Sequence, residues 1–451
     1  MLNNELYLIY LLVSVLFILS IRGLAKPNTA LFSNRLGMLA MLIAIVATLF
    51  VLPEQNHIWI LVAIFSGAAV GIISGLKVKI TALPQMVAVF NGLGGLSSVL
   101  VALTEIRNLS EAYIEIAISV IIGAVAFMGS MVAYFKLQGV AKKYLKKLPL
   151  HNVLNLVSFI ILIFAFGNFL VTPNIETLFY LMCFAFVWSF LVVMQVGGAD
   201  MPIVVSTLNA CSGFAASAIG FSVNNVSLII TGALVGASGC ILTFIMTKAI
   251  NRSLLDVLFF NKTQDDIGID VKDKTVHTAS EEDAAFILEN SSKIIIVPGF
   301  GMAAAEAQFA LKNMALILKN KYGASVKFAI HPVAGRMPGH MNVLLAEAGI
   351  DYEDVFEMDD INPEFATADA VYVIGANDIT NPAAKTLTTS PLYGMPILDV
   401  YKAKTVFFVK RTLGAGYSKT DNPLFFADNT MMIFGDAKKV TENIVKALEL
   451  G

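Results

Sequence analysis

The first 250 residues consist mainly of long apolar stretches separated by short polar segments. Each stretch is long enough to cross the roughly 30 Å hydrocarbon core of a bilayer as a helix. The first one lacks the basic start and the small-residue cleavage site of a signal peptide, so it too is predicted to span the membrane. The pattern predicts nine spans, near residues 6–21, 36–52, 58–75, 83–103, 114–135, 153–171, 177–196, 201–221 and 226–247.

In the rest of the chain, the apolar runs are shorter. After a polar segment from Asn261 to Ala279, short apolar runs alternate with amphipathic ones, which is typical of a doubly wound parallel sheet with helices. A long helix is predicted over residues 301–320. Strands are predicted at 293–298, 326–331, 370–375, 405–410 and 430–435, with a weaker one near 353–356.

These patterns predict the fold class, a multi-span α-helical membrane bundle followed by an α/β Rossmann-like domain. The domain organisation we expect is a transmembrane domain over residues 1–252, a linker over 253–279 and a dinucleotide-binding domain over 280–451.

Charge separates the same two parts of the chain. Residues 1–252 hold 13 Lys/Arg and 7 Asp/Glu, whereas residues 253–451 hold 18 and 26. Only 14% of all residues are charged, which excludes a wholly soluble protein, a disordered chain and a nucleic-acid binder built on basic patches.

Basic residues concentrate in alternate loops of the first part. By the positive-inside rule, we expect the N-terminus outside and the C-terminal domain inside.

Small and polar residues within the spans carry further information. Gly67, Gly71 and Gly75 share one face of the third span, and Gly232 and Gly236 share one face of the ninth. Helices in lipid approach closely where such small residues meet, so both sets predict tight helix packing.

Four polar side chains lie within or beside the spans. Asn91, Ser130 and Asn209 are placed mid-span, and Asp200 stands at the cytoplasmic mouth of the eighth span. Polar groups in hydrocarbon are costly, so each amide indicates either a hydrogen bond between helices or a transport pathway. The sequence alone leaves both open. Since no strongly ionisable side chain is mid-span, a pathway would use hydroxyls, amides and water, or a titrating group from another chain.

The turn after the first predicted strand of the second part has the pattern GxGxxA. Gly299 permits a tight turn, Gly301 lets the backbone approach a pyrophosphate, and the small Ala304 is expected to let the helix pack on the strand. This strand–turn–helix context predicts a dinucleotide site, although a simple tight turn is the alternative.

The choice of dinucleotide follows from two strand ends. An NAD site places a carboxylate after the second strand to bind the ribose 2′-hydroxyl, but this chain has His331-Pro332 there. Lys410-Arg411 follow a later strand, and the guanidinium fork suits a phosphate dianion. Together these residues favour NADP(H).

Three segments rich in Gly, Asn, Asp or Pro follow predicted strands, over 330–342, 375–384 and 410–426. Ligands of parallel sheets bind at such strand ends. We expect His331, Arg336 and Asp378 to face the cofactor, with a cap or an ion pair as the alternative role of each. The stretch Gly414–Gly416 with Tyr417 is a candidate lid.

Several of these segments resemble one known family. The strings GFGMAAAEAQ, HPVAGRMPGHMNVLLAEA, GANDITNPAA, KRTLGAGY with NPLFF, FGDAK, GGADMP and GALVGASG are similar to the beta subunits of proton-translocating NAD(P) transhydrogenases. The resemblance implies direct hydride transfer from NADH to NADP⁺ without a covalent intermediate, Si- to Re-specific, coupled to inward proton translocation across the cytoplasmic (inner) membrane.

The resemblance also implies cofactors and partners. NADP(H) would bind to this chain in a reversed orientation under a lid, and NAD(H) would bind to an alpha subunit that adds membrane helices. The alpha–beta pair would dimerise in membrane lipid, without metal or nucleic acid. Its implied NADP contacts include the turn, strand-end and lid residues already named. The list is completed by Phe300, Val333, Ala334, Gly335, Met337, Pro338, Gly375, Ala376, Asn377, Ile379, Gly394, Met395, Thr412, Leu413, Ala415, Asp436 and Ala437.

In the membrane part, the resemblance associates Ser130, Asp200 and Asn209 with proton conduction and coupling, and Asp378 is a candidate for coupling near the nucleotide. Some family members have a histidine where this chain has Asn91. Because Asn cannot titrate, an obligatory protonatable group would lie elsewhere. The alternative function is an ion channel or transporter regulated by a dinucleotide-sensing domain, but the chain has no TVGYG-type potassium filter.

Overall fold

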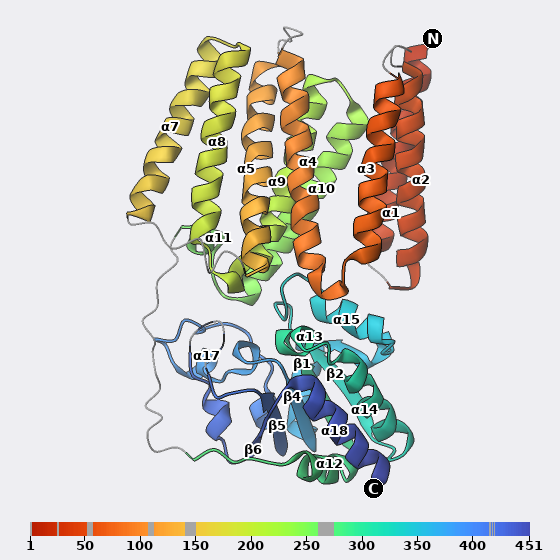
Figure 1. Ribbon diagram of the computed structural model, residues 1–451, viewed down its shortest axis with the longest axis vertical. Coiled ribbons are helices and arrows are strands. Elements are labelled where there is room, and N and C mark those ends of the chain that lie inside the picture. Colours follow the sequence, from red (N-terminus) through yellow and green to blue (C-terminus); the bar gives the residue numbers. More distant parts are fainter. Residues whose placement is uncertain are drawn as a thin grey trace. The chain divides into compact units, whose positions relative to one another are not determined.

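The computed structural model describes residues 2–24, 27–51, 57–106, 112–139, 150–259, 275–414, 416, 418 and 420–451 (Figure 1). The chain divides into two compact units, Met1–Gln195 with Val204–Thr243, and Val196–Ile203 with Phe244–Gly451. Most of the predicted linker, residues 260–274, lies outside the described residues.

Nine helices in the described residues are long and apolar enough to cross a membrane, which confirms the predicted spans. Apolar side chains can face lipid all round such a helix, so length and hydropathy decide where each begins and ends. They are α1 Leu2–Leu24, α2 Pro27–Val51, α3 His57–Lys77, α4 Leu83–Glu105, α5 Tyr113–Leu137, α7 His151–Val171, α8 Ile175–Gln195, α9 Met201–Ser222 and α10 Val226–Ala249.

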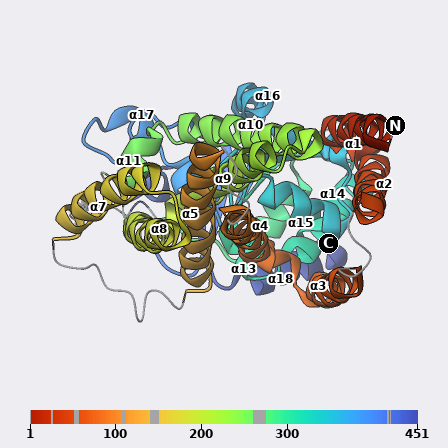
Figure 2. The same cartoon turned by 90° about the horizontal axis from the view of Figure 1, so that it is seen from above.

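Helix α5 is central to the first unit, where it lies between α4 and α8 (Figures 1 and 2). Gly95 of α4 and Gly123 of α5 bring the two backbones together: a Cβ atom added to Gly95 would lie 2.6 Å from the Gly123 carbonyl oxygen. Around this contact, Val99, Ile116 and Leu178 are fully buried. Small residues therefore set the helix spacing, as expected in lipid.

The glycine pair of the ninth span packs as predicted. A Cβ atom added to Gly232 would lie 2.5 Å from the Ser217 nitrogen, and one added to Gly213 would lie 2.4 Å from the Gly236 nitrogen. Helices α9 and α10 thus meet backbone to backbone along this seam.

The glycine face of the third span behaves differently. No heavy atom of the described residues lies within 4 Å of a Cβ atom added to Gly67, Gly71 or Gly75, and α3 has no buried residue. The predicted tight packing of this face is therefore wrong within the described part of the chain.

The second unit contains a six-stranded parallel sheet in the order β3-β2-β1-β4-β5-β6. All six predicted strands are confirmed. The strands that lie inside the sheet read as continuous apolar runs because both of their faces are covered. The strands are β1 Lys293–Pro298, β2 Ser325–Ile330, β3 Val355–Glu357, β4 Ala370–Ile374, β5 Thr405–Lys410 and β6 Thr430–Phe434.

Helices accompany this sheet, and among them α18 packs against both α12 and α14. Short α11 lies within the predicted linker and begins with a capping box of Ser253 and Asp256. The α-helices are α11 Leu254–Leu258, α12 Glu281–Glu289, α13 Phe300–Ala304, α14 Gln308–Asn320, α15 His340–Ala348, α16 Met358–Ile361, α17 Ala383–Thr386 and α18 Ala437–Leu450. The 3₁₀ turns are Ile80–Ala82, Gly198–Asp200, Tyr352–Asp354, Asn362–Thr367, Asp378–Thr380, Val400–Lys402 and Pro423–Phe426.

The helix predicted over residues 301–320 is two helices, α13 and α14. The break lies at Glu306, which has a φ of 53°, and the Ala307 N–H donates to the Met302 carbonyl at 3.1 Å. This is the hydrogen-bond pattern of a helix end that ordinarily uses glycine, so the alanine-rich sequence gave no sign of it. The packing role predicted for Ala304 is also wrong, because Ala304 is exposed and Ala303 is buried instead.

The seam between α9 and α10 can be tested by adding one methyl group. We expect Gly213→Ala to destabilise the purified chain by about 1–3 kcal/mol, the usual cost of overpacking, and to lower its unfolding temperature in detergent by several degrees. Gly71→Ala, on a glycine face without a close neighbour among the described residues, is the matched control and should leave the unfolding temperature unchanged or slightly raised. Equal effects of the two variants would contradict the described packing.

Candidate functional site

The strand order places the site between β1 and β4. From this pair, β2 and β3 continue in one direction and β5 and β6 in the other, so the connections that follow β1 and β4 lead in opposite directions along the sheet. Ligands of open parallel sheets bind at such a switch point, beyond the carboxyl ends of the strands. Those predicted nucleotide contacts that the structure describes follow strand ends at this edge or lie in the segments that connect them.

Glycines hold the two central turns against each other. The Gly301 N–H donates to the Gly375 carbonyl at 2.9 Å, and a Cβ atom added to Gly301 would lie 2.6 Å from the Gly375 Cα atom. A Cβ atom on Gly299 would lie 2.4 Å from the Gly375 carbonyl oxygen. Gly375 itself has a φ of 68°, which favours glycine. The glycines of the GxGxxA motif therefore also serve a turn-to-turn contact that the motif alone does not reveal.

Arg336, in the loop after β2, lies against the same turn. Its Cζ atom lies over the Phe300 ring, 4.1 Å from the centroid, which is within the range of a cation–π interaction. Gly335, with a φ of 106°, makes the bend that brings Arg336 there. The structure thus brings the predicted contacts Phe300 and Arg336 together, and Val333, Ala334, Met337 and Pro338 lie in the same loop.

His331 is placed as an anchor between two loops. Its Nδ1 atom accepts from the Val333 N–H at 3.2 Å, and its Nε2 atom lies 2.9 Å from the Pro396 carbonyl oxygen. Burial lowers the pKa of His331 to about 4, so the ring is neutral near pH 7. Both ring nitrogens have protein partners, and the Pro396 bond places the predicted pair Gly394-Met395 beside this loop.

The turn after β4 contacts the candidate lid. The Asp378 carboxylate accepts from the backbone N–H and the hydroxyl of Ser418, both at 2.9 Å. Asn377 Oδ1 accepts from the Asn422 side chain at 3.1 Å, while Ala376 and Ile379 are buried. A Cβ atom on Gly416 would lie 2.3 Å from Asp378 Oδ1, so this segment lies directly on the carboxylate. The predicted contacts Ala415 and Tyr417 are outside the described residues.

The basic pair at the end of β5, Lys410 and Arg411, lies near the end of β6. Arg411 Nη2 is 2.8 Å from Asp436 Oδ2, and the Arg411 side chain is 72% exposed. Asp436 also caps α18 through the Lys438 N–H. Lys410 lies 4.6 Å from the Phe425 ring centroid, and burial lowers its pKa. The predicted contacts Thr412, Leu413 and Gly414 follow this pair, and Ala437 begins α18.

The donor set of this edge fits an anionic dinucleotide. Arg336, Lys410 and Arg411 supply positive charge. Two buried donors, Asn377 Nδ2 and His340 Nε2, have no hydrogen-bond partner among the described residues. Buried polar groups are nearly always paired, so such donors indicate a ligand or a bound water. No cluster of metal-binding side chains occurs in the described part of the chain.

Asn91 and Ser130, two of the polar residues predicted within the spans, lie on helices α4 and α5 of the first unit, which pack against each other. Asn91 Nδ2 of α4 is 3.4 Å from the Val205 carbonyl oxygen of α9, and Ser130 of α5 is fully buried with no partner for its hydroxyl among the described residues. A Cβ atom on Gly92 would lie 3.2 Å from the Ser130 Cβ atom. Asn209 is half-buried one turn beyond Val205, on the same face of α9.

Asp200 has a charged partner. Its Oδ2 atom lies 3.0 Å from Arg252 Nη1, and its side chain is 13% exposed. Burial raises the pKa of Asp200, although Arg252 opposes the shift. The pair joins the start of α9 to the segment that follows α10.

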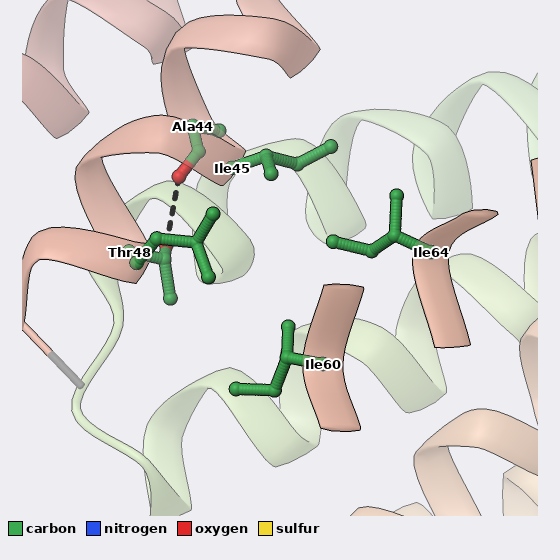
Figure 3. A pocket seen from close by; sticks show the side chains of 6 residues that line it. Ala44, Ile45, Thr48, Ile60 and Ile64 are labelled. Atoms are coloured by element: carbon green, nitrogen blue, oxygen red, sulfur yellow. Dashed lines mark hydrogen bonds between the residues drawn. The ribbon is translucent and has the colours of Figure 1, made fainter. Parts of the chain in front are cut away.

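A separate cavity of about 230 Å³ lies between α2 and α3, lined by Ala44, Ile45, Thr48, Leu49, Ile60 and Ile64 (Figure 3). Its one polar side chain, Thr48, donates to the Ala44 carbonyl at 2.7 Å. An apolar gap of this kind suits a lipid chain rather than a nucleotide.

The fold is that of a helical membrane bundle followed by a Rossmann-like domain, with a candidate nucleotide site at the β1–β4 switch point. The sequence profile of the family described as NAD(P) transhydrogenase beta subunit matches residues 6–447. The chain is 50% identical, over 97% of its length and 98% of the relative's, to the NAD(P) transhydrogenase subunit beta of Rhodospirillum rubrum, and equally to the protein of that name from its strain ATCC 11170. The chain therefore belongs to the NAD(P) transhydrogenase beta subunit family, as the sequence resemblance indicates.

The buried state of His331 predicts a pH dependence. In the unfolded chain a histidine takes up a proton near pH 6.5, whereas folded His331 does so only near pH 4. The folded state therefore loses stability as the pH falls from about 6.5 towards 4, by at most about 3 kcal/mol from this residue. Unfolding temperatures of the full chain between pH 7.5 and 4.5 should show a shallower pH slope for His331→Gln than for the unaltered protein. Exposed His277 provides the control, since His277→Gln should keep the full slope; equal slopes for all three proteins would contradict the assignment.

Proposed function

We propose that this chain is the NADP(H)-binding subunit of a proton-translocating NAD(P) transhydrogenase. The observation that carries the proposal is the candidate site at the β1–β4 switch point, where Lys410 ends β5, Arg411 follows it, and His331-Pro332 rather than a carboxylate follows β2. Membership of the family supports the use of nicotinamide nucleotides. The charges at the site support NADP(H) as the nucleotide on this chain.

Arg411 is the proposed partner of the 2′-phosphate. Its guanidinium already bonds one carboxylate, Asp436, at 2.8 Å, and it is largely exposed. A phosphate dianion offers the same fork of oxygens with more charge. The exchange of Asp436 for phosphate would leave Asp436 at the N-terminus of α18, where a carboxylate is stabilised by the helix amides.

The hydride chemistry is supplied by the bound nicotinamide rings, and the chain contributes position and exclusion of water. Phe300 and Arg336 would hold the nucleotide against the glycine turns. The segment from Lys410 to Ser418, fastened to Asp378 through Ser418, would cover it. No nucleophile or general base is required, because we propose a direct hydride transfer that is Si- to Re-specific.

A second nucleotide must come from a second chain. Residues 280–451 contain one GxGxxA turn and the described part of the domain forms one six-stranded sheet. The relatives are named subunit beta, which supports an alpha subunit as the partner. We propose that this partner binds NAD(H) and adds membrane helices, and that alpha–beta pairs dimerise in the lipid of the cytoplasmic (inner) membrane.

The proposed proton path runs through the polar groups of α4, α5 and α9. Asn91, Ser130 and Asn209 supply hydrogen-bonding groups without a titrating one. Asp200, whose pKa is raised by burial, is the proposed coupling group, with Asp378 as its counterpart at the nucleotide. The distribution of basic loops supports an outside N-terminus, a cytoplasmic NADP domain and inward proton movement.

Nucleotide choice provides the first test. Removing the charge-assisted bonds of Arg411 should cost about 1.5–3 kcal/mol, or roughly ten- to a hundredfold in affinity. Titration of the purified chain should therefore show that Arg411→Ala weakens NADPH binding far more than any residual NADH binding. Lys446→Ala is the control, because it removes an exposed charge of α18. It should change the affinity for neither NADPH nor NADH. Equal losses for NADPH and NADH would remove the 2′-phosphate assignment.

Coupling provides the second test. In proteoliposomes with the partner subunit, Asn209→Leu should suppress proton pumping and alter NADP(H) release by at least fivefold, the lower range of typical coupling energies, while assembly stays intact. Exposed Ser238 of α10 gives the control, since Ser238→Leu should pump normally. If Asn209→Leu pumps with normal stoichiometry, Asn209 is a packing residue.

A further inference from the structure

His340 is a buried histidine at the nucleotide edge that the sequence did not single out. It is the first residue of α15 and follows Gly339, which has a φ of 70°. Its ring folds back over the preceding loop, so that a Cβ atom added to Gly335 would lie 2.7 Å from His340 Nδ1. The side chain is fully buried.

One ring nitrogen holds the loop in place. His340 Nδ1 accepts from the Arg336 N–H at 3.1 Å. A backbone N–H can only donate, so Nδ1 carries the lone pair and the proton of the neutral ring is on Nε2. Burial and the nearby Arg336 lower the pKa of His340 to about 4, which keeps the ring in this neutral form at physiological pH.

The other ring nitrogen is a donor without an acceptor. His340 Nε2 is buried and has no hydrogen-bond partner among the described residues. His331 is the useful contrast, because both of its nitrogens are bonded within the domain. A fixed, buried N–H is costly unless something accepts its hydrogen bond.

The surroundings indicate the chemistry of that acceptor. The ring centroid of His340 lies 6.5 Å from that of Phe300, and the Arg336 guanidinium lies over the other ring at 4.1 Å. His340 also stands at the N-terminus of the nine-residue α15, where the helix dipole favours an anion. A neutral donor, a cation and a helix N-terminus beside a GxGxxA turn suit a phosphate oxygen.

We propose that His340 is a nucleotide-binding and positioning residue of this site, whose Nδ1 holds the Arg336 peptide and whose Nε2–H donates to a phosphate oxygen of the bound dinucleotide. The inference rests on the proposed function, because it takes NADP(H) to be the ligand. It adds a specific donor that neither the GxGxxA pattern nor the basic pair supplies.

Two amide substitutions separate the two roles of the ring. In His340→Asn, the side-chain amide reaches about as far as Nδ1 and can accept from the Arg336 N–H, but nothing replaces the Nε2 donor. In His340→Gln, the amide reaches about as far as Nε2 and can donate, but the Nδ1 acceptor is lost. His340→Leu lacks both groups.

NADPH titration of the full chain should order these variants. We expect His340→Asn and His340→Leu to bind NADPH about tenfold or more weakly, and His340→Gln to stay within about threefold of the unaltered protein. Unchanged NADPH affinity in all three variants would overturn the assignment of His340. Loss in the Gln variant with none in the Asn variant would overturn the donor role.

A measurement on the unaltered chain keeps the test independent of variant folding. With ¹⁵N-labelled histidine, NADPH should shift the Nε2 resonance of His340 while leaving that of exposed His277 in place. An unmoved Nε2 resonance at saturating NADPH would contradict the inference and leave the proposed function standing. Failure of the unaltered chain to bind NADPH at all would overturn both.

Discussion

The close approach of two glycine turns is the constraint on which the nucleotide site depends. Gly299 and Gly301 after β1 lie against Gly375 after β4, with a backbone bond of 2.9 Å from the Gly301 N–H to the Gly375 carbonyl. A side chain at any of these positions would meet backbone atoms at less than 3 Å. Because the turns touch, Phe300 and Asp378 follow at neighbouring points of one edge, and the loops that carry Arg336 and Ser418 reach them.

Around this fixed centre, the site is built from groups whose bonding is incomplete or replaceable. The buried Nε2 of His340 and Nδ2 of Asn377 lack partners among the described residues, and the exposed Arg411 pairs with Asp436, which the 2′-phosphate would replace in the proposed complex. Ser130 is a similar case in the membrane unit, where its buried hydroxyl has no described partner. Folding leaves hydrogen-bonding capacity unused at His340, Asn377 and Ser130. Nucleotide binding would use that capacity at His340 and Asn377, and proton movement would use it at Ser130.

The sequence predicted the membrane spans and the strands well, because the length and periodicity of apolar runs determine where such elements form. Nine spans and six strands follow from apolar runs, and the loops of the site follow from strand ends. Features that depend on contacts between distant segments were not predictable. The break at Glu306 relies on a positive φ in a residue that rarely adopts one, and His340 is recognised only once its ring is seen to accept from Arg336. The stripe Gly67, Gly71 and Gly75 looks like the packed seam of α9 and α10 in sequence, yet its face has no close neighbour among the described residues.

The central claim is that this chain holds one half of a two-nucleotide reaction. Hydride transfer requires the two nicotinamides to approach to about 3–3.5 Å, and the proposed site on this chain would hold one of them. The direct measurement is the rate of hydride transfer from NADH to NADP⁺ by the purified 451-residue chain, alone and with an NAD-binding partner subunit. The account predicts tight NADPH binding with negligible turnover by the chain alone, and turnover once the partner is added. Substantial transhydrogenation by the isolated chain would contradict it.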